Sequence, residues 1–226
     1  MSKSKGIKKV KATVPNKKKY LYRHKGYLLT KAKTMRHYLE KAAKEVRRLG
    51  ERLLEFYLVL VDRYAEAGVD GIMSSDDWGS QNGLMINPKI WRRIFKPWYK
   101  ELVNAIHKRG LHAILHSCGN IYEIIPDLIE IGFDVLHPIQ PGALDLEKVA
   151  REFKGKICFF GGIDVQYLLP KGNPREVREG ITRAIKTLAS KEGGVIAAPA
   201  NAIVPDIPLE NIKTMYETVA EFNTNA

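Results

Sequence analysis

Two side chains that can bind a transition metal stand two residues apart in the middle of the chain. His116 offers an imidazole nitrogen and Cys118 a thiolate sulfur, and both are ordinary zinc ligands. The apolar residues before them indicate a strand, on which alternate side chains share a face, so the two can reach one ion. Gly119 and Asn120 end the strand, and Asn120 with Glu123 has the spacing of a helix cap. A catalytic zinc site usually has three protein ligands, and this pair supplies only two. The alternative is therefore that His116 is a partly buried histidine and Cys118 an unreactive thiol in the core.

The segments around this pair alternate between apolar strands and amphipathic helices. Apolar residues spaced three and four apart predict helices over residues 34–64, 88–109, 121–131, 144–153, 174–188 and 208–222. Pro97 should kink the second of them. Short apolar runs predict strands over residues 69–75, 111–116, 134–138, 156–161 and 194–198. This alternation predicts an α/β fold of the (β/α) TIM-barrel type, and an incomplete one, because a full barrel has eight strands.

Polar residues follow every predicted strand. The clusters are Asp76-Asp77-Trp78, His116-Ser117-Cys118, His137-Pro138-Ile139-Gln140, Gly161-Gly162-Ile163-Asp164 and Pro199-Ala200-Asn201. The carboxyl ends of parallel strands meet at one edge of a barrel, where such enzymes carry their active sites. We therefore expect the clusters to line one pocket, and this placement favours a functional interpretation of the histidine and cysteine pair.

Each cluster contributes candidates for catalysis or binding. We assign catalytic roles to Asp76, Asp77 and Asp164; the first two could act as a general base or bind a ring by hydrogen bonds, or only cap the strand end. We expect substrate contacts from Trp78, Gln140, Gly161, Gly162 and Asn201. An indole can form a wall for a flat ligand, or simply pack in the core, and glycines allow close backbone approach. His137 is left unassigned.

Charge is distributed unevenly along the 226 residues. The net charge is +12, yet 17 of the 37 Lys and Arg residues and only two acidic residues lie within residues 1–50. We therefore expect residues 1–33 to form a basic, poorly ordered arm and residues 34–226 to form one barrel domain. The arm could touch nucleic acid, but no nucleic-acid motif accompanies it, so we expect a solvated arm instead.

The sequence also indicates in which cellular compartment the protein is found. No apolar run approaches the roughly 18 residues of a membrane span, and the N-terminus lacks the apolar centre of a secretory signal. We therefore expect a cytoplasmic protein with no membrane partner. Cys118 and Cys158 lie on separate predicted strands and do not require a disulfide.

The ordered motifs resemble the uroporphyrinogen decarboxylase superfamily over about residues 50–222. They are Asp76-Asp77-Trp78-Gly79, His116-Ser117-Cys118-Gly119-Asn120, Gln140-Pro141, Gly161-Gly162-Ile163-Asp164-Val165-Gln166 and Pro205-Asp206-Ile207-Pro208-Leu209-Glu210-Asn211. The resemblance implies a TIM barrel, here shortened at the N-terminus. The superfamily contains haem-pathway decarboxylases and zinc-dependent methyltransferases, which move a methyl group from a methylated corrinoid protein to a thiol such as coenzyme M.

The His-x-Cys pair is similar to the methyltransferase branch, in which these two residues and a later cysteine bind zinc. By this resemblance His116 and Cys118 are zinc ligands, and a corrinoid is the methyl donor. This chain has Asn201 near the place of the later cysteine. The third ligand therefore stays open among Asp76, Asp77 and Asp164. Zinc lowers the pKa of a bound thiol and presents a thiolate at neutral pH, which is the nucleophile such a reaction needs.

Two other functions stay open, and with them the question of whether the chain is an enzyme at all. It could be a uroporphyrinogen decarboxylase, although the aspartate and arginines of that reaction have no counterpart before residue 50. It could also be an inactive, shortened paralogue with a binding or assembly role. The expected partner is a corrinoid protein or a tetrapyrrole-type ligand, and a homo-oligomer could close the open barrel.

Overall fold

The computed structural model describes residues 17–191 and 194–224, and within them the side chains of residues 42–191 and 194–222. The chain divides into two compact units, residues 1–50 and residues 51–226. Residues 1–16 of the predicted basic arm lie outside the described residues, so the disorder predicted for them stays a prediction. The domain boundary at residue 33 also stays a prediction.

The first helix starts earlier than the sequence pattern predicts. α1 (Lys17–Glu66) includes residues of both units, whereas we predicted a helix over 34–64 with a break near Gly50. Lys, Arg and Leu are good helix formers, and residues 17–33 are rich in them. The prediction gave more weight to their charge and weak periodicity than to this propensity.

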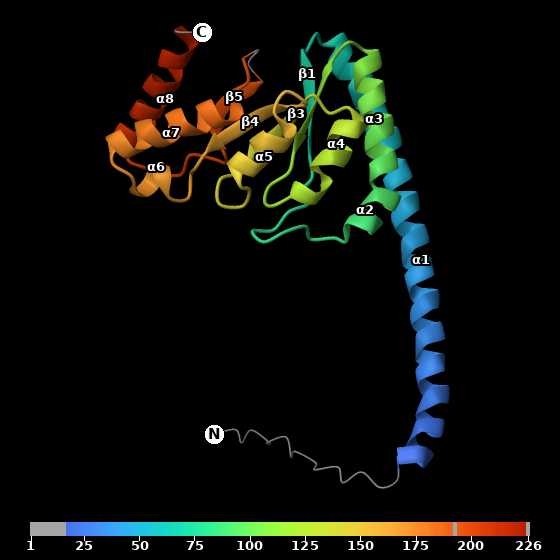
Figure 1. The fold of residues 1–226 in the computed structure, drawn as a ribbon. Coiled ribbons are helices and arrows are strands. Elements are labelled where there is room, and N and C mark those ends of the chain that lie inside the picture. The colour runs from blue at the N-terminus through green and yellow to red at the C-terminus, as the bar shows by residue number, and fades with distance from the viewer. Residues whose placement is uncertain (1–16, 192–193, 225–226) are drawn as a thin grey trace, which may run out of the picture. The chain divides into compact units, whose positions relative to one another are not determined.

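Five parallel strands form one sheet in the second unit (Figure 1). They pair in chain order and are β1 (Gly71–Ser75), β2 (His112–His116), β3 (Val135–Ile139), β4 (Cys158–Ile163) and β5 (Val195–Pro199). Each lies within two residues of a predicted strand. Parallel strands that pair in chain order, with helices between them, build the wall of a (β/α) barrel. Within the described residues β1 and β5 stay at the two edges, so the barrel is incomplete, as predicted.

Helices connect the strands and pack on one face of the sheet (Figure 1). The links from β1 to β4 are α2 (Pro88–Ile94), α3 (Lys96–Lys108), the 3-10 helix η1 (Tyr122–Ile124), α4 (Ile125–Ile131) and α5 (Leu146–Phe153). α6 (Leu168–Lys171) and α7 (Pro174–Leu188) lead to β5, and α8 (Leu209–Thr224) follows it.

Local chemistry sets two of these helix boundaries. The second predicted helix divides into α2 and α3 at Phe95, because Pro97 has no backbone N–H for the preceding turn. The helix cap predicted for Asn120 and Glu123 is wrong. Asn120 Oδ1 accepts a hydrogen bond from the backbone N of Tyr122 at 3.2 Å, and a residue without a side-chain cap precedes the 3-10 helix. In this short turn the side chain of Asn120 pairs with the backbone N–H two residues later, instead of capping a helix.

The main core lies between the sheet and its helices. Ala113 and Leu115 of β2 are fully buried there, as are Trp91 of α2 and Val103 of α3. Because side chains alternate along a strand, His116 of β2 lies on the opposite face, which the helices do not cover. In a complete barrel that face is the interior, so His116 lies on the face that a closed barrel would enclose.

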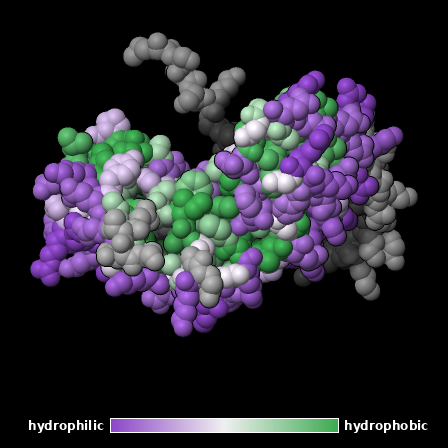
Figure 2. Space-filling model, turned by 90° about the horizontal axis from the view of Figure 1, so that it is seen from above, coloured by the Kyte–Doolittle hydropathy of each residue, from purple (hydrophilic) through white to green (hydrophobic). Residues whose placement is uncertain are grey.

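The face of the sheet that the helices leave open carries apolar side chains at both edges. Met73 of β1 and Ile196 of β5 are each 46% exposed. They pair with Ile114 and Phe160, which belong to the same face. In the view of Figure 2, hydrophobic atoms gather near the middle of the molecule, with hydrophilic atoms on either side. None of the helices in the described parts of the chain has the length and apolarity that crossing a membrane requires.

Candidate metal centre

The loops that leave β1 and β2 touch, backbone to backbone. The N–H of Gly79 donates to the carbonyl of Cys118 at 3.2 Å. A Cβ on Gly79 would lie 2.6 Å from backbone atoms of residues 118–120, and a Cβ on Gly119 would lie 2.5 Å from the backbone of Gly79. Gly119 also has a φ of +80°, a conformation that favours glycine. These two glycines allow the first loop to carry Asp77 over the end of β2.

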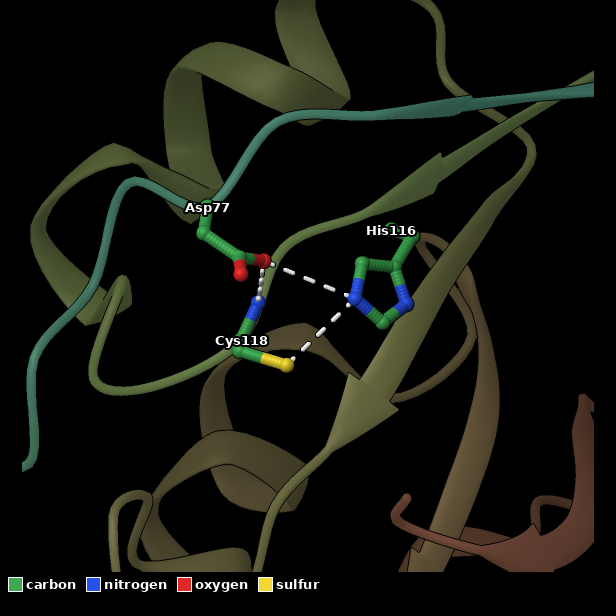
Figure 3. Close-up of side chains that lie close together, drawn as sticks. All are labelled: Asp77, His116 and Cys118. Atoms are coloured by element: carbon green, nitrogen blue, oxygen red, sulfur yellow. Dashed lines mark hydrogen bonds and ion pairs between the residues drawn. The ribbon is translucent and has the colours of Figure 1, made fainter. Parts of the chain in front are cut away.

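Three side chains of types that can bind a metal ion meet at this crossing (Figure 3). His116 Nε2 lies 3.3 Å from Cys118 Sγ and 3.5 Å from Asp77 Oδ1. The backbone N–H of Cys118 donates to the same Asp77 oxygen at 2.9 Å, which fixes the carboxylate. The three ligand atoms all lie within 4.8 Å of one another, and they are the one such group among the described residues. The structure therefore brings the predicted pair together and adds Asp77 to it.

Two of the three separations between these donor atoms suit a tetrahedral zinc ion. Zinc bonds of 2.0–2.3 Å at tetrahedral angles place two ligand atoms about 3.3–3.8 Å apart. The sulfur–nitrogen and nitrogen–oxygen separations measured at His116 lie in that range. One sulfur, one nitrogen and one oxygen are also a donor set that zinc accepts. The side chain of Asp77 is 55% exposed and that of His116 is 22% exposed, so one side of the site is open to a further ligand.

Charge at the site favours a cation. Burial raises the pKa of the Cys118 thiol, and the negative charge of Asp77 raises it further. The thiol therefore keeps its proton when only the carboxylate is nearby. A divalent ion would reverse this balance, because it neutralises the carboxylate and favours the thiolate.

A second histidine, which sequence analysis left unassigned, contacts the first. His137 and His116 are paired residues of β3 and β2, and their Nδ1 atoms lie 2.7 Å apart. Burial and the neighbouring His116 lower the pKa of His137 to about 4. The positions of both histidines at adjacent strand ends are the signal that could have found this contact from sequence.

Two amide side chains contact residues of the site. Asn201 Nδ2 lies 3.8 Å from Cys118 Sγ, in position to donate a weak hydrogen bond to the sulfur. Gln140 Oε1 accepts from the backbone N–H of Gly119 at 3.2 Å. Both predicted substrate-binding amides therefore lie at the site, although in this structure they contact protein atoms, and their contacts with a substrate stay predictions.

Asp76 joins a chain of hydrogen bonds with Tyr99 and Trp78. Tyr99 of α3 donates its hydroxyl to Asp76 Oδ2 at 2.5 Å and accepts from Trp78 Nε1 at 2.8 Å. Burial, mainly, and Asp77 raise the pKa of Asp76, while the tyrosine hydrogen bond opposes the rise. The Trp78 ring packs 4.5 Å from that of Phe95. Asp76 and Trp78 thus connect the site to the core, and their predicted catalytic and binding roles stay untested.

The remaining candidates do not join the group formed by Asp77, His116 and Cys118. Asp164 Oδ1 accepts from the backbone N–H groups of Gln166 and Tyr167, which caps the turn before α6. A Cβ on Gly161 would lie 3.1 Å from the backbone of β3, and one on Gly162 would lie 2.8 Å from a leucine side chain. These glycines allow close packing within the chain. Of the three carboxylates considered for a third ligand, the structure groups only Asp77 with the pair.

Comparison with known proteins identifies relatives of the chain. The family model described as uroporphyrinogen decarboxylase (URO-D) matches residues 24–222. The methylcobamide:CoM methyltransferase MtaA of Methanosarcina barkeri is 23% identical over 169 residues, which cover 74% of this chain and 46% of that protein. The methylcobamide:CoM methyltransferase MtbA of Methanosarcina acetivorans is 22% identical over 168 residues and is covered to 47%. The chain therefore spans about half the length of these curated relatives.

A solved structure has the same fold. A methyltransferase from Methanosarcina mazei superimposes with a TM-score of 0.60 at 23% sequence identity, over 75% of this chain and 47% of that one. The match agrees with the α/β fold and the open five-stranded sheet. The family model extends the likeness noted in the sequence toward the N-terminus, from about residue 50 to residue 24. The chain belongs to the uroporphyrinogen decarboxylase family.

Proposed function

We propose that this chain binds Zn²⁺ through Asp77, His116 and Cys118 and serves methyl transfer from a methylated corrinoid to a thiol. The observation that carries the proposal is the convergence of three different donor atoms at the carboxyl edge of a parallel sheet. Relatives that are methylcobamide:CoM methyltransferases support methyl transfer as the kind of reaction. A corrinoid protein is accordingly the proposed partner.

The residues of the site suit this chemistry. Zinc, when bound, supplies a Lewis acid that keeps a substrate thiol in its thiolate form at neutral pH. The N–H of Cys118 holds the carboxylate of Asp77 in place, and His116 presents Nε2 to the same point. The exposed side of Asp77 leaves room for the thiol to approach. The amide of Asn201 faces the sulfur of Cys118, where an N–H group stabilises negative charge.

The proposed ligand set differs from the one that the methyltransferase branch implies. There a second cysteine completes the site, whereas here Asn201 stands near its place and Asp77 enters from another loop. Because a carboxylate replaces a thiolate, the ligands still carry two negative charges. A carboxylate is a harder ligand than a thiolate, so we expect this site to bind zinc less tightly than a site with two cysteines.

Metal analysis tests the binding part of the proposal. The purified chain should retain about one zinc per chain after dialysis against metal-free buffer, as one site of three protein ligands implies. Asp77→Ala, His116→Ala and Cys118→Ser should each lose most of it. Cys158→Ser and His112→Ala are matched controls, because they remove the same side chains outside the site and should keep the zinc. A wild-type chain without zinc would overturn the proposal.

A spectroscopic assay tests the reaction. Methylcobalamin and its demethylated product differ in visible absorption, so transfer of the methyl group to an added thiol can be followed directly. We expect a thiol-dependent rate with the zinc form and none with Asp77→Ala. A chain that binds zinc and shows no transfer would leave the metal site intact but remove methyl transfer as its function. Sedimentation of the same sample would test whether the chain forms the homo-oligomer that could close the barrel.

A further inference from the structure

The neighbour of His116 on the adjacent strand is itself a histidine. His116 and His137 are paired residues of β2 and β3, so both side chains lie on the sheet face that the helices leave open. Their ring centres are 4.9 Å apart, and their Nδ1 atoms are 2.7 Å apart. At that separation one Nδ1 carries a hydrogen and the other accepts it.

The position of His137 is fixed from several sides. Its backbone carbonyl accepts from the N–H of Ser117 at 2.7 Å, which continues the pairing of the two strands. Its ring lies 4.5 Å from the ring of Phe160 on β4. The side chain is half-buried between these strands. It therefore offers a rigid partner to His116.

The direction of this hydrogen bond decides whether His116 can bind a metal. If Nδ1 of His116 carries the hydrogen, Nε2 has a free lone pair, and Nε2 is the atom that faces Asp77 and Cys118. If His137 donates instead, neutral His116 carries its hydrogen on Nε2 and has no electron pair for a metal there. A flip of the His116 ring would place carbon atoms against both neighbours and lose the bond.

We propose that His137 is a positioning residue of the metal centre: its Nδ1 accepts the hydrogen of His116 Nδ1 and holds the Nε2 lone pair of His116 toward Asp77 and Cys118. The inference rests on the zinc site proposed above and adds a residue to it. A histidine that binds a metal commonly donates its other ring N–H to an acceptor, and removal of such an acceptor typically weakens metal binding about 10–100-fold. Here the acceptor is a second imidazole.

A pair of substitutions separates the acceptor from the bulk of the ring. His137→Phe keeps a planar ring but removes the acceptor, so we expect zinc binding about 10–100-fold weaker, measured by competition with a chromogenic chelator. His137→Asn places an oxygen near the position of Nδ1 and should restore most of the affinity. The control is His112→Phe, which changes an exposed histidine at the start of β2, outside the site, and should leave zinc affinity unchanged.

Two spectroscopic readouts distinguish positioning from a general loss of structure. The cobalt(II) form of His137→Phe should show visible bands shifted from those of the wild type, and the asparagine variant should return them. In the zinc form of the wild type, nitrogen-15 NMR should find the hydrogen on Nδ1 of His116 and on Nε2 of His137. This NMR measurement needs no variant, so it tests the inference even if a substitution prevents folding.

The possible results separate the two proposals. The role of His137 would be overturned if His137→Phe bound zinc as tightly as the wild type, or if NMR found the opposite tautomers. Neither result would contradict the proposed zinc site. A wild-type chain that binds no zinc would overturn both proposals. Weakened binding by the phenylalanine variant with recovery by the asparagine variant supports the positioning role.

Discussion

Substitution of Gly119 by alanine tests how the site is built, because this glycine lies where two loops cross. Its φ of +80° costs an L-residue about 1–2 kcal/mol. Gly68 provides a matched control, since its φ is +76° but a Cβ there meets nothing within 4 Å. Alanine at Gly68 should therefore cost the backbone strain alone.

Alanine at Gly119 carries a second cost. Its Cβ would lie 2.5 Å from the backbone of Gly79, whereas ordinary contacts begin at 3.4 Å, so one loop must move by roughly 1 Å. Overpacking of this kind costs a further 1–3 kcal/mol or so. A shift of roughly 1 Å exceeds the tolerance of about 0.2 Å in a metal–ligand distance. The same variant should therefore bind zinc at least about tenfold more weakly, a loss of about 1.4 kcal/mol.

Urea unfolding of the metal-free proteins measures the first effect, and chelator competition measures the second. We expect Gly119→Ala to lose about 2–5 kcal/mol of unfolding free energy and Gly68→Ala about 1–2 kcal/mol. Zinc affinity should fall only in Gly119→Ala. Equal stability and equal zinc affinity in the two variants would refute the idea that the loop crossing positions Asp77.

Two further substitutions give results in opposite directions. Asn201→Cys adds a thiol next to Cys118, and we expect tighter zinc binding than in the wild type, detected by chelator competition; unchanged affinity would mean that residue 201 lies too far from the ion. Tyr99→Phe leaves Asp76 Oδ2 and Trp78 Nε1 without their partner, so we expect a loss of about 1–3 kcal/mol in urea unfolding. The tyrosine hydrogen bond lowers the pKa of Asp76, so its removal should destabilise the fold more at neutral pH than at acid pH, where Asp76 is protonated in both states; an equal loss at both would contradict this role.

Periodicity was enough to predict the sheet, because apolar strands buried on the helix side leave a strong local signal. All five strands lie within two residues of their predicted positions. The placement of His116 and Cys118 at a strand end followed from the same signal. The helix boundaries were harder. The turn at Asn120 depends on a single hydrogen bond that periodicity does not report. The division at Phe95, in contrast, agrees with the kink predicted from Pro97.

The third side chain of the proposed metal site could not be chosen from the sequence. Asp76, Asp77 and Asp164 all follow strands, and the choice among them depends on loop geometry. Asp77 reaches the pair because two glycines allow the loops to cross, while Asp164 caps a turn. His137 was missed for a related reason, since its contact with His116 depends on the register between two strands. Both features involve residues far apart in the chain.

The measurement that tests the central claim most directly is zinc X-ray absorption on the zinc-loaded chain without added thiol. We predict one sulfur ligand at about 2.3 Å, with the remaining nitrogen and oxygen ligands at about 2.0–2.2 Å. Cys158→Ser should give the wild-type spectrum, because that cysteine lies outside the site. A wild-type spectrum with no sulfur, or with two, would contradict a site made of Asp77, His116 and Cys118.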